Sequence, residues 1–94
     1  MRIISRRPLR EFQTRHTPAL APLEHWYRVA LHAVWTNLVE VRRDFPHADP
    51  VGALTIFNIH GNGYRLITRI DYRRQKIFVV EVLTHAEYSR RYTH

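Results

Sequence analysis

The sequence predicts an α+β domain in which two N-terminal helices pack on one face of a mostly antiparallel β-sheet. A long apolar stripe with helical spacing lies in the first half of the chain, and three strand-like runs separated by turn residues lie in the second half. The chain has 94 residues, so we expect a single domain over residues 1–94. The expected element order is β-α-α-β-β-β, followed by a short C-terminal helical tail.

The first strand and the first helix are expected within the N-terminal segment. The apolar run MRIIS predicts a short strand that starts at the first residue. The next run, RRPLREFQTRH, predicts a helix, because Pro8 suits a first helical turn and Leu9 and Phe12 are three residues apart.

The second helix carries the clearest periodic signal in the chain. After Pro22, seven apolar residues follow the spacing of a buried stripe. They are Leu23, Trp26, Tyr27, Ala30, Leu31, Val34 and Leu38. Because a stripe of this kind usually faces the core, we expect Trp26 and Tyr27 to be core or half-core residues and not a platform on which bases stack.

Three strands are expected after the polar segment VRRDFPHADPVG, which reads as a loop because it holds two prolines and a glycine. ALTIFNIH is rich in β-branched and aromatic residues, and HGNG predicts a turn because Gly and Asn tolerate positive φ. YRLITRIDY alternates, and KIFVVEVL returns after a turn at RRQ. These strands predict an antiparallel meander, and the helical tail begins at about His85.

The charge and composition of the chain point to an anionic partner. The formal net charge is +7, and fourteen of the fifteen basic residues are arginine. A small basic domain suits nucleic acid, an acidic protein or both. The chain has no cysteine, which removes disulfides, cysteine-ligated zinc and a cysteine nucleophile, and which fits a cytoplasmic protein.

Other classes of protein are disfavoured by the sequence. No apolar run approaches the roughly 20 residues that span a bilayer, and the N-terminal apolar stretch is too short for a signal peptide. The seven histidines do not have a metal-ligand spacing, so we expect no metal site. We also expect no cofactor.

Alternation along the middle strand of the meander places two arginines on its open face. Arg65 and Arg69 lie on the side opposite Tyr64 and Leu66, about 13 Å apart at the usual rise of a strand. A hairpin centred on Arg74 would put Glu81 across from Ile67, diagonal to both arginines. Two interpretations remain open: a surface ladder of salt bridges, or a basic concave surface on which Glu81 holds the arginines in place.

The helical tail adds two groups that can transfer protons. His85 and Tyr88 are three residues apart and would share one face of a helix. Histidine exchanges a proton near neutral pH, and a tyrosine hydroxyl can do so when nearby arginines lower its pKa. Two such groups beside cations match the needs of RNA cleavage by the 2′-hydroxyl: a base, an acid and stabilisation of charge on the phosphate.

At these residues the sequence resembles a known family. The segments MRIISRRPLREF, LEHWYRVA, FNIHGNGYRL and THAEY together resemble the HigB family of type II toxin–antitoxin toxins, which are RelE-like messenger-RNA interferases. The resemblance covers essentially the whole chain. It implies a RelE-like fold, ribosome-dependent cleavage of messenger RNA in the decoding site, and inhibition by a helix-turn-helix, HigA-like antitoxin. Contact with DNA would be indirect, through that antitoxin.

The resemblance also implies roles for individual residues. The catalytic set would be His85, Tyr88, Arg65 and Arg69. Glu87 is part of the THAEY motif, and Glu81 is a supporting residue. Asn58 and Asn62 match the FNIxGN asparagines, and we interpret them as mainly structural: Asn62 for the turn and Asn58 for a hydrogen bond at the strand end. The family tends to have basic residues where this chain has Gly63 and Val80.

Further basic residues outside this set are expected to contact the ribosome or RNA. They are Arg6, Arg7, Arg10, Arg15, Arg42, Arg43, Lys76, Arg90 and Arg91. The alternative is that they form a solvated face.

For the function of the whole protein, the first expectation is a metal-independent endoribonuclease. The alternatives are a catalytically weak RNA- or ribosome-binding module that inhibits translation without cleavage, and a protein-interaction domain. Which of His85 and Tyr88 is acid and which is base stays open.

Overall fold

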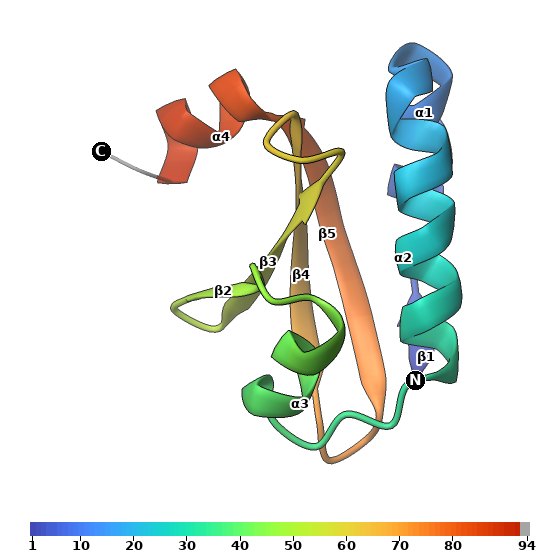
Figure 1. Cartoon of the computed structure of the whole chain (residues 1–94), viewed down its shortest axis with the longest axis vertical. Coiled ribbons are helices and arrows are strands. Elements are labelled where there is room, and N and C mark those ends of the chain that lie inside the picture. The colour runs from blue at the N-terminus through green and yellow to red at the C-terminus, as the bar shows by residue number, and fades with distance from the viewer. Residues whose placement is uncertain (93–94) are drawn as a thin grey trace.

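The computed structural model describes residues 1–92, and its centre is a five-stranded sheet (Figure 1). The strand order across the sheet is β1-β5-β4-β3-β2. The strands are β1 (Arg2–Ile4), β2 (Asp49–Val51), β3 (Leu54–Ile59), β4 (Tyr64–Asp71) and β5 (Lys76–Thr84). Strands β2 to β5 form an antiparallel meander, and β1 pairs in parallel with the start of β5. The predicted α+β class and the mostly antiparallel sheet are confirmed.

The predicted pair Ile67–Glu81 is present in the β4–β5 hairpin, but near the turn the register differs by one residue from that of a hairpin centred on Arg74, because Asp71 pairs with Lys76. Ile67 lies opposite Glu81, and Arg65 lies opposite Leu83. The register shifts between Ile67 and Thr68, where β5 contributes one extra residue. A bulge of this kind increases the local twist of the strands. The part of the sheet near the end of β5 is therefore turned relative to the part near its start.

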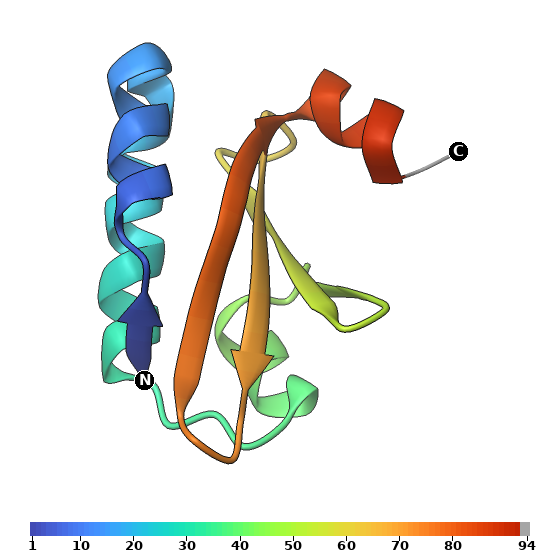
Figure 2. The same cartoon turned by 180° about the vertical axis from the view of Figure 1, so that it is seen from behind.

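Helices α1 (Arg7–Arg15) and α2 (Leu20–His32) lie side by side along one face of the sheet, joined by a 3₁₀ turn over Thr17–Ala19 (Figures 1 and 2). The expectation that α2 continues to Leu38 is wrong. The chain becomes extended at Ala33, and the α-amino group of Met1 donates hydrogen bonds to the carbonyl oxygens of Ala30, Leu31 and Ala33. These bonds satisfy acceptors that the end of a helix leaves open.

A third helix extends into the segment that the sequence analysis reads as a loop, residues 41–52. Helix α3 (Leu38–Asp44) begins after Asn37, whose Oδ1 accepts a hydrogen bond from Glu40 N at 3.0 Å. This N-cap starts a new helix and overrides the longer apolar periodicity. The same segment also contains β2, an edge strand. Pro50 is compatible with an edge because it does not need to donate to a further strand.

Both faces of the sheet carry apolar clusters. The larger cluster lies between the sheet and α1, α2 and α3, and contains Trp26, Trp35 and Phe57. Trp26 is fully buried and Tyr27 is partly buried, as predicted. The smaller cluster lies on the opposite face, where Ile56, Ile67, Leu83 and Tyr88 pack together.

The C-terminal helix α4 (His85–Tyr92) follows β5 without a linker and covers the end of that second face (Figure 1). Thr84 N donates to Glu87 Oε1 at 2.9 Å, and Glu87 N donates to Thr84 Oγ1 at 3.2 Å. This reciprocal pair is a capping box and explains why the helix starts at His85, as the sequence predicts. Within residues 1–92, no helix has the length and apolar character needed to cross a membrane.

Candidate active site

The guanidinium group of Arg65 links the β3–β4 turn to the start of α4. Its Nη2 donates to Asn62 Oδ1 at 3.1 Å and to His85 Nδ1 at 3.3 Å. Its Nη1 donates to the carbonyl oxygens of Asn62 and Tyr64 at 3.3 and 3.2 Å. The backbone N–H of His85 also donates to the carbonyl oxygen of Gly63 at 3.0 Å. The structure thus brings Arg65, Asn62 and His85 together at one end of the sheet.

The contact with Arg65 determines the hydrogen position on a neutral His85 ring. A guanidinium group has donors only, so His85 Nδ1 must accept the hydrogen bond. A neutral ring then carries its hydrogen on Nε2, and its one lone pair is engaged with Arg65. Protonation of Nδ1 would remove this bond and place two cations side by side.

Tyr88 also lies close to Arg65. The Cζ atom of Arg65 is 5.5 Å from the centre of the Tyr88 ring, which stacks on Tyr92 at 5.2 Å. The Tyr88 side chain is 7% exposed. Tyr88 is also one of the residues that line an open groove beside Arg65.

The open groove beside Tyr88 has a volume of about 440 Å³. It is lined by Arg42, Pro46, His47, Ala48, Asp49, Ile56, Asn58, Arg65 and Tyr88. The sequence analysis did not assign His47 to the site, because it treated the segment before β3 as a plain loop. The pairing of β2 with β3 brings this segment to Arg65, and the histidine and aspartate in FPHADP were the only local signal for it.

Arg69 does not join this constellation. Its Cζ atom lies 4.3 Å from the centre of the Phe78 ring, and Phe78 is its direct neighbour on β5. Arg69 is four residues further along β4 than Arg65, beyond the register shift. Within residues 1–92 it makes no hydrogen bond or ion pair with His85 or Tyr88, and its catalytic role stays a prediction.

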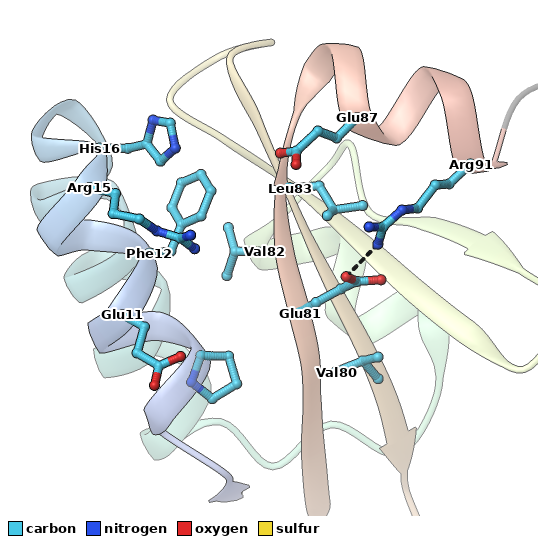
Figure 3. A pocket seen from close by; sticks show the side chains of 11 residues that line it. Glu11, Phe12, Arg15, His16, Val80, Glu81, Val82, Leu83, Glu87 and Arg91 are labelled. Atoms are coloured by element: carbon cyan, nitrogen blue, oxygen red, sulfur yellow. Dashed lines mark hydrogen bonds and ion pairs between the residues drawn. The ribbon is translucent and has the colours of Figure 1, made fainter.

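Glu81 binds the C-terminal helix and not the strand arginines. Its Oε1 accepts a hydrogen bond from Arg91 Nη1 at 2.7 Å (Figure 3). Its Oε2 accepts one from the Tyr92 hydroxyl at 3.1 Å. This corrects the interpretation that Glu81 holds Arg65 and Arg69 in place. The Glu81 carboxylate instead holds α4, and hence Tyr88, against the sheet. Burial of Tyr92, together with Glu81, raises the pKa of the Tyr92 hydroxyl.

The two asparagines of FNIHGN have roles other than those expected. The residues with left-handed backbone in the turn are His60 and Gly61, with φ of 54° and 60°, and not Asn62. Asn62 contributes by binding Arg65 through its side chain. The Asn58 amide has no hydrogen-bond partner in the described part of the chain, so the expected bond at the strand end is absent.

The other basic residues are spread over the surface. Arg42 lies on α3, where its Nε donates to the carbonyl oxygen of Ala48 at 2.9 Å, and it lines the groove. Arg6 covers the ring of Tyr27, and Arg7 pairs with Glu11. The remaining members are exposed on α1, α3 and α4, or lie at the start of β5 (Lys76). They are Arg10, Arg15, Arg43, Arg90, Arg91 and Lys76.

A second depression, with a volume of about 390 Å³, lies between α1 and β5 (Figure 3). Phe12 and Val82 line it, and so do the paired side chains of Glu81 and Arg91. Val80 is exposed and also lines this depression. In residues 1–92, no group of three or more His, Asp or Glu side chains is arranged to hold a metal ion.

The fold, with its helices on one face of a five-stranded sheet and a short C-terminal helix at the site, is that of a RelE-like α+β protein. The sequence profile of the HigB toxin family, described as a RelE-like toxic component of a toxin-antitoxin system, matches residues 19–91. The chain therefore belongs to the HigB toxin family.

A relative in Escherichia coli supports this assignment. The chain is 28% identical over 93 residues to a protein named mRNA interferase HigB from Escherichia coli O6:H1 (strain CFT073). The alignment covers 96% of this chain and 90% of that relative. Membership in a family of toxin–antitoxin toxins implies that the protein has an antitoxin partner.

Proposed function

We propose that this protein is the toxin of a type II toxin–antitoxin system and acts as a ribosome-dependent endoribonuclease on messenger RNA. The observation that carries the proposal is the contact between Arg65 and His85, with Tyr88 beside Arg65 in the lining of the same groove. The name of the Escherichia coli relative, an mRNA interferase, supports the same activity. The proposed toxin domain is the whole chain, 1–94, because β1 and α1, which precede the matched segment, pack onto the same sheet.

The proposed reaction is an internal phosphoryl transfer. The 2′-oxygen of one ribose attacks the adjacent phosphorus and loses its proton to a base, and the P–O5′ bond breaks as an acid protonates the leaving oxygen. The products are a 2′,3′-cyclic phosphate and a free 5′-hydroxyl. His85 and Tyr88 supply the two proton transfers, and Arg65 stabilises the charge on the phosphate oxygens. These groups suffice for the chemistry without a metal ion.

Arg65 is proposed to couple the binding of phosphate to the ability of His85 to accept a proton. Both terminal nitrogens of the guanidinium group are engaged with Asn62, Tyr64 and His85, which leaves the Nε donor for a ligand. A phosphate in the groove competes for these donors because hydrogen bonds to an anion are stronger than those to a neutral ring. When Arg65 turns to the phosphate, the His85 lone pair becomes available to accept a proton.

Dependence on the ribosome is supported by the shape of the site. The groove is wide and its walls include exposed residues such as Arg42, His47 and Asp49. A bound messenger RNA on the ribosome is already extended and positioned, which removes much of the entropic cost of orienting the reacting groups.

A second candidate function is inhibition of translation without cleavage. Arg69 lies over Phe78 away from the site, and Gly63 and Val80 stand where the family tends to have basic residues. A Cβ atom at Gly63 would meet the carbonyl oxygen of His60 at 3.2 Å, so the turn leaves little room for a side chain there. Fewer cations near the phosphate would lower the rate of cleavage more than they would lower the affinity for RNA or the ribosome.

Cleavage mapping on translating ribosomes tests the proposal. Wild-type protein should cut messenger RNA to give 2′,3′-cyclic phosphate ends, and His85→Ala should lose most of this activity. His32→Ala serves as the matched control, because His32 is exposed on α2 and binds only the carbonyl oxygen of Arg28. Growth arrest with intact messenger RNA would favour inhibition without cleavage. A protein that neither arrests growth nor cuts RNA would contradict both proposals.

A further inference from the structure

A small recess opens off the groove at the loop between α3 and β2. Its volume is about 100 Å³, which is the scale of a single planar ring and not of a whole nucleotide. It is lined by Asp44, Phe45, Pro46, His47, Ala48 and Asn58, and four of these residues also line the larger groove. The two depressions therefore adjoin each other along this loop.

The loop that forms the recess is held in place by the surrounding structure. Arg42 Nε donates to the Ala48 carbonyl oxygen at 2.9 Å, and Ala48 N donates to the Phe45 carbonyl oxygen at 3.0 Å. The Phe45 ring packs edge-on against Phe57 and Trp35 at 5.3 and 6.0 Å. The recess is thus a preformed feature, and His47 projects from a constrained loop.

Asn58 places an unused amide between the recess and Arg65. It is the direct neighbour of Arg65 across the β3–β4 ladder, and paired residues on one face have Cβ atoms about 5 Å apart. Within residues 1–92 its amide has no hydrogen-bond partner. An amide offers donors and an acceptor side by side, which is the pattern that the edges of nucleobases complement.

The charges around the recess select against a phosphate. Asp44 and Asp49 carry carboxylates at its wall and at the adjoining groove wall, and Asp44 Oδ2 accepts a hydrogen bond from Trp35 Nε1 at 2.9 Å. An anion placed here would meet like charge, whereas Arg65 on the neighbouring strand attracts one. A neutral planar group suits the recess, with the phosphate to which it is linked at Arg65.

We propose that this recess, with Asn58 and His47, is a subsite for the nucleobase of a nucleotide that flanks the cleaved phosphate. The proposal rests on the proposed ribonuclease function. The base packs against the His47 and Pro46 rings, and the Asn58 amide hydrogen-bonds to the edge of the base. Recognition of RNA bases by stacking and edge contacts is common for unpaired strands. This subsite gives the enzyme a base preference at one position next to the cut.

The first test measures base preference in the cleavage maps. Wild-type protein should favour certain bases at one position beside the cut, and Asn58→Ala should reduce the ratio between the best and the worst base there by about tenfold. Asn58→Asp, which keeps the size but has acceptors only, should shift the preference toward bases that donate from an amino group. His47→Ala should weaken the same preference, with His32→Ala as its matched control. Ratios within one variant are compared, so a general loss of rate does not affect the result.

A second measurement separates this inference from the proposed function. Ribonucleoside 3′-monophosphates are titrated into ¹⁵N-labelled protein, with ribose 5-phosphate as the ligand that lacks a base. Saturable shifts of the Asn58 side-chain amide with the nucleotides, and none with ribose phosphate, support the subsite even if the protein does not cut RNA. The subsite is overturned if the Asn58 signal responds equally to ribose phosphate or to neither ligand. It is also overturned if an active enzyme keeps the same base ratios in Asn58→Ala and Asn58→Asp.

Discussion

At the scale of single residues, the site depends on how one guanidinium group is shared. Arg65 donates to Asn62, to the carbonyl oxygen of Tyr64 and to His85 at the same time. Such sharing needs a planar group with several donors in fixed directions, which an ammonium group does not have. The choice of arginine at this position is therefore a matter of geometry as well as charge.

Substitution of Arg65 by lysine tests this view. We expect Arg65→Lys to be partly active and Arg65→Ala to be much less active, because lysine keeps the charge but cannot hold Asn62 and His85 together. The loss for lysine should be roughly tenfold or more, in line with the greater strength of bidentate contacts. The measurement is the rate of cleavage on ribosomes under single-turnover conditions. A lysine variant with the wild-type rate would leave a charge-only role for Arg65.

Removal of the Tyr88 hydroxyl should affect chemistry and not folding. Tyr88→Phe keeps the ring that packs against Ile67 and Leu83, so thermal unfolding should be close to wild type. Cleavage should fall by roughly 10²–10⁴, the usual contribution of a proton-transfer group, while ribosome binding stays nearly intact. His85→Gln should behave in the same way. Wild-type rates in either variant would exclude that residue from the proposed mechanism.

At the scale of elements, the position of Tyr88 depends on how α4 is attached. The helix is fixed at its start by the Thr84–Glu87 capping box and near its end by Glu81, which binds Arg91 and Tyr92. These contacts, with the packing of Tyr88 on the sheet, hold a helix that is too short to be stable alone. The site is thus assembled only when α4 is docked.

The capping box predicts a pH dependence of stability. The backbone N–H of Thr84 is the main cause of the lowered pKa of Glu87, relative to an ordinary value of 4.5. A carboxyl group whose pKa is lower in the folded state contributes stability above its unfolded pKa, and loses it as the pH falls through the folded pKa. Wild type should therefore be more stable than Glu87→Ala at about pH 7, and the difference should shrink as the pH falls below about 4.

Chemical denaturation across that pH range measures the effect. Glu11→Ala is a matched control, because it removes an exposed carboxylate whose ion pair with Arg7 is on the surface. Such pairs contribute little, so that control should show a much smaller change. A Glu87→Ala difference that is constant with pH would mean that the side chain contributes by packing and not by its charge.

At the scale of the whole molecule, the arginines outside the site offer a way to hold ribosomal RNA. Arg10 and Arg15 are exposed on α1 and have no ion pair within residues 1–92. Contacts with phosphates release counterions, and log affinity then falls with log salt by about 0.7–0.9 for each neutralised phosphate. Reversal of both residues to Glu should weaken ribosome binding and flatten this slope.

The control is a double variant in which Arg2 and Arg73 are changed to Glu. It has the same net charge as the Arg10 and Arg15 variant, but its substitutions lie at exposed residues outside the expected contact set. Binding curves at several salt concentrations compare the two double variants, and thermal unfolding checks that both remain folded. Equal slopes in the two variants would favour a general effect of net charge. A wild-type affinity that does not respond to salt would contradict the proposed phosphate contacts.

The antitoxin partner is expected on the outer surface of α1 and α2. Leu20, Leu31 and Val34 are exposed there or just beyond the end of α2, with exposed fractions of 43%, 43% and 73%. Arg10, His16, His25, Arg28 and His32 provide polar surroundings for such an apolar contact. Inhibition would then work by blocking entry to the ribosome, with His85 and Tyr88 left accessible.

Hydrogen exchange with and without the antitoxin tests this arrangement. We expect new protection within residues 8–35 and little change at the end of β5 and in α4. The competing arrangement is an acidic segment of the antitoxin that fills the groove at Arg65, which the net charge of +7 would also favour. Protection confined to residues 64–92 would show that the groove is plugged and would contradict docking on the helices.

The sequence alone determined the features that depend on local pattern. The buried stripe predicted Trp26 in the core, alternation predicted the strands, and the C-terminal pattern predicted a helix from about His85. Each of these follows from the period of a helix or strand, or from turn chemistry over a few residues. The motifs also indicated the family to which the chain belongs.

The tertiary structure decided which side chains meet. Arg65 joins His85 from 20 residues away, while Arg69 on the same face lies beyond the bulge and packs on Phe78. Glu81 turns to α4, and β2 carries His47 to the groove. These partners depend on strand twist, on the bulge and on where α4 docks. Such features arise only when distant segments pack together, so no local pattern in the sequence encodes them.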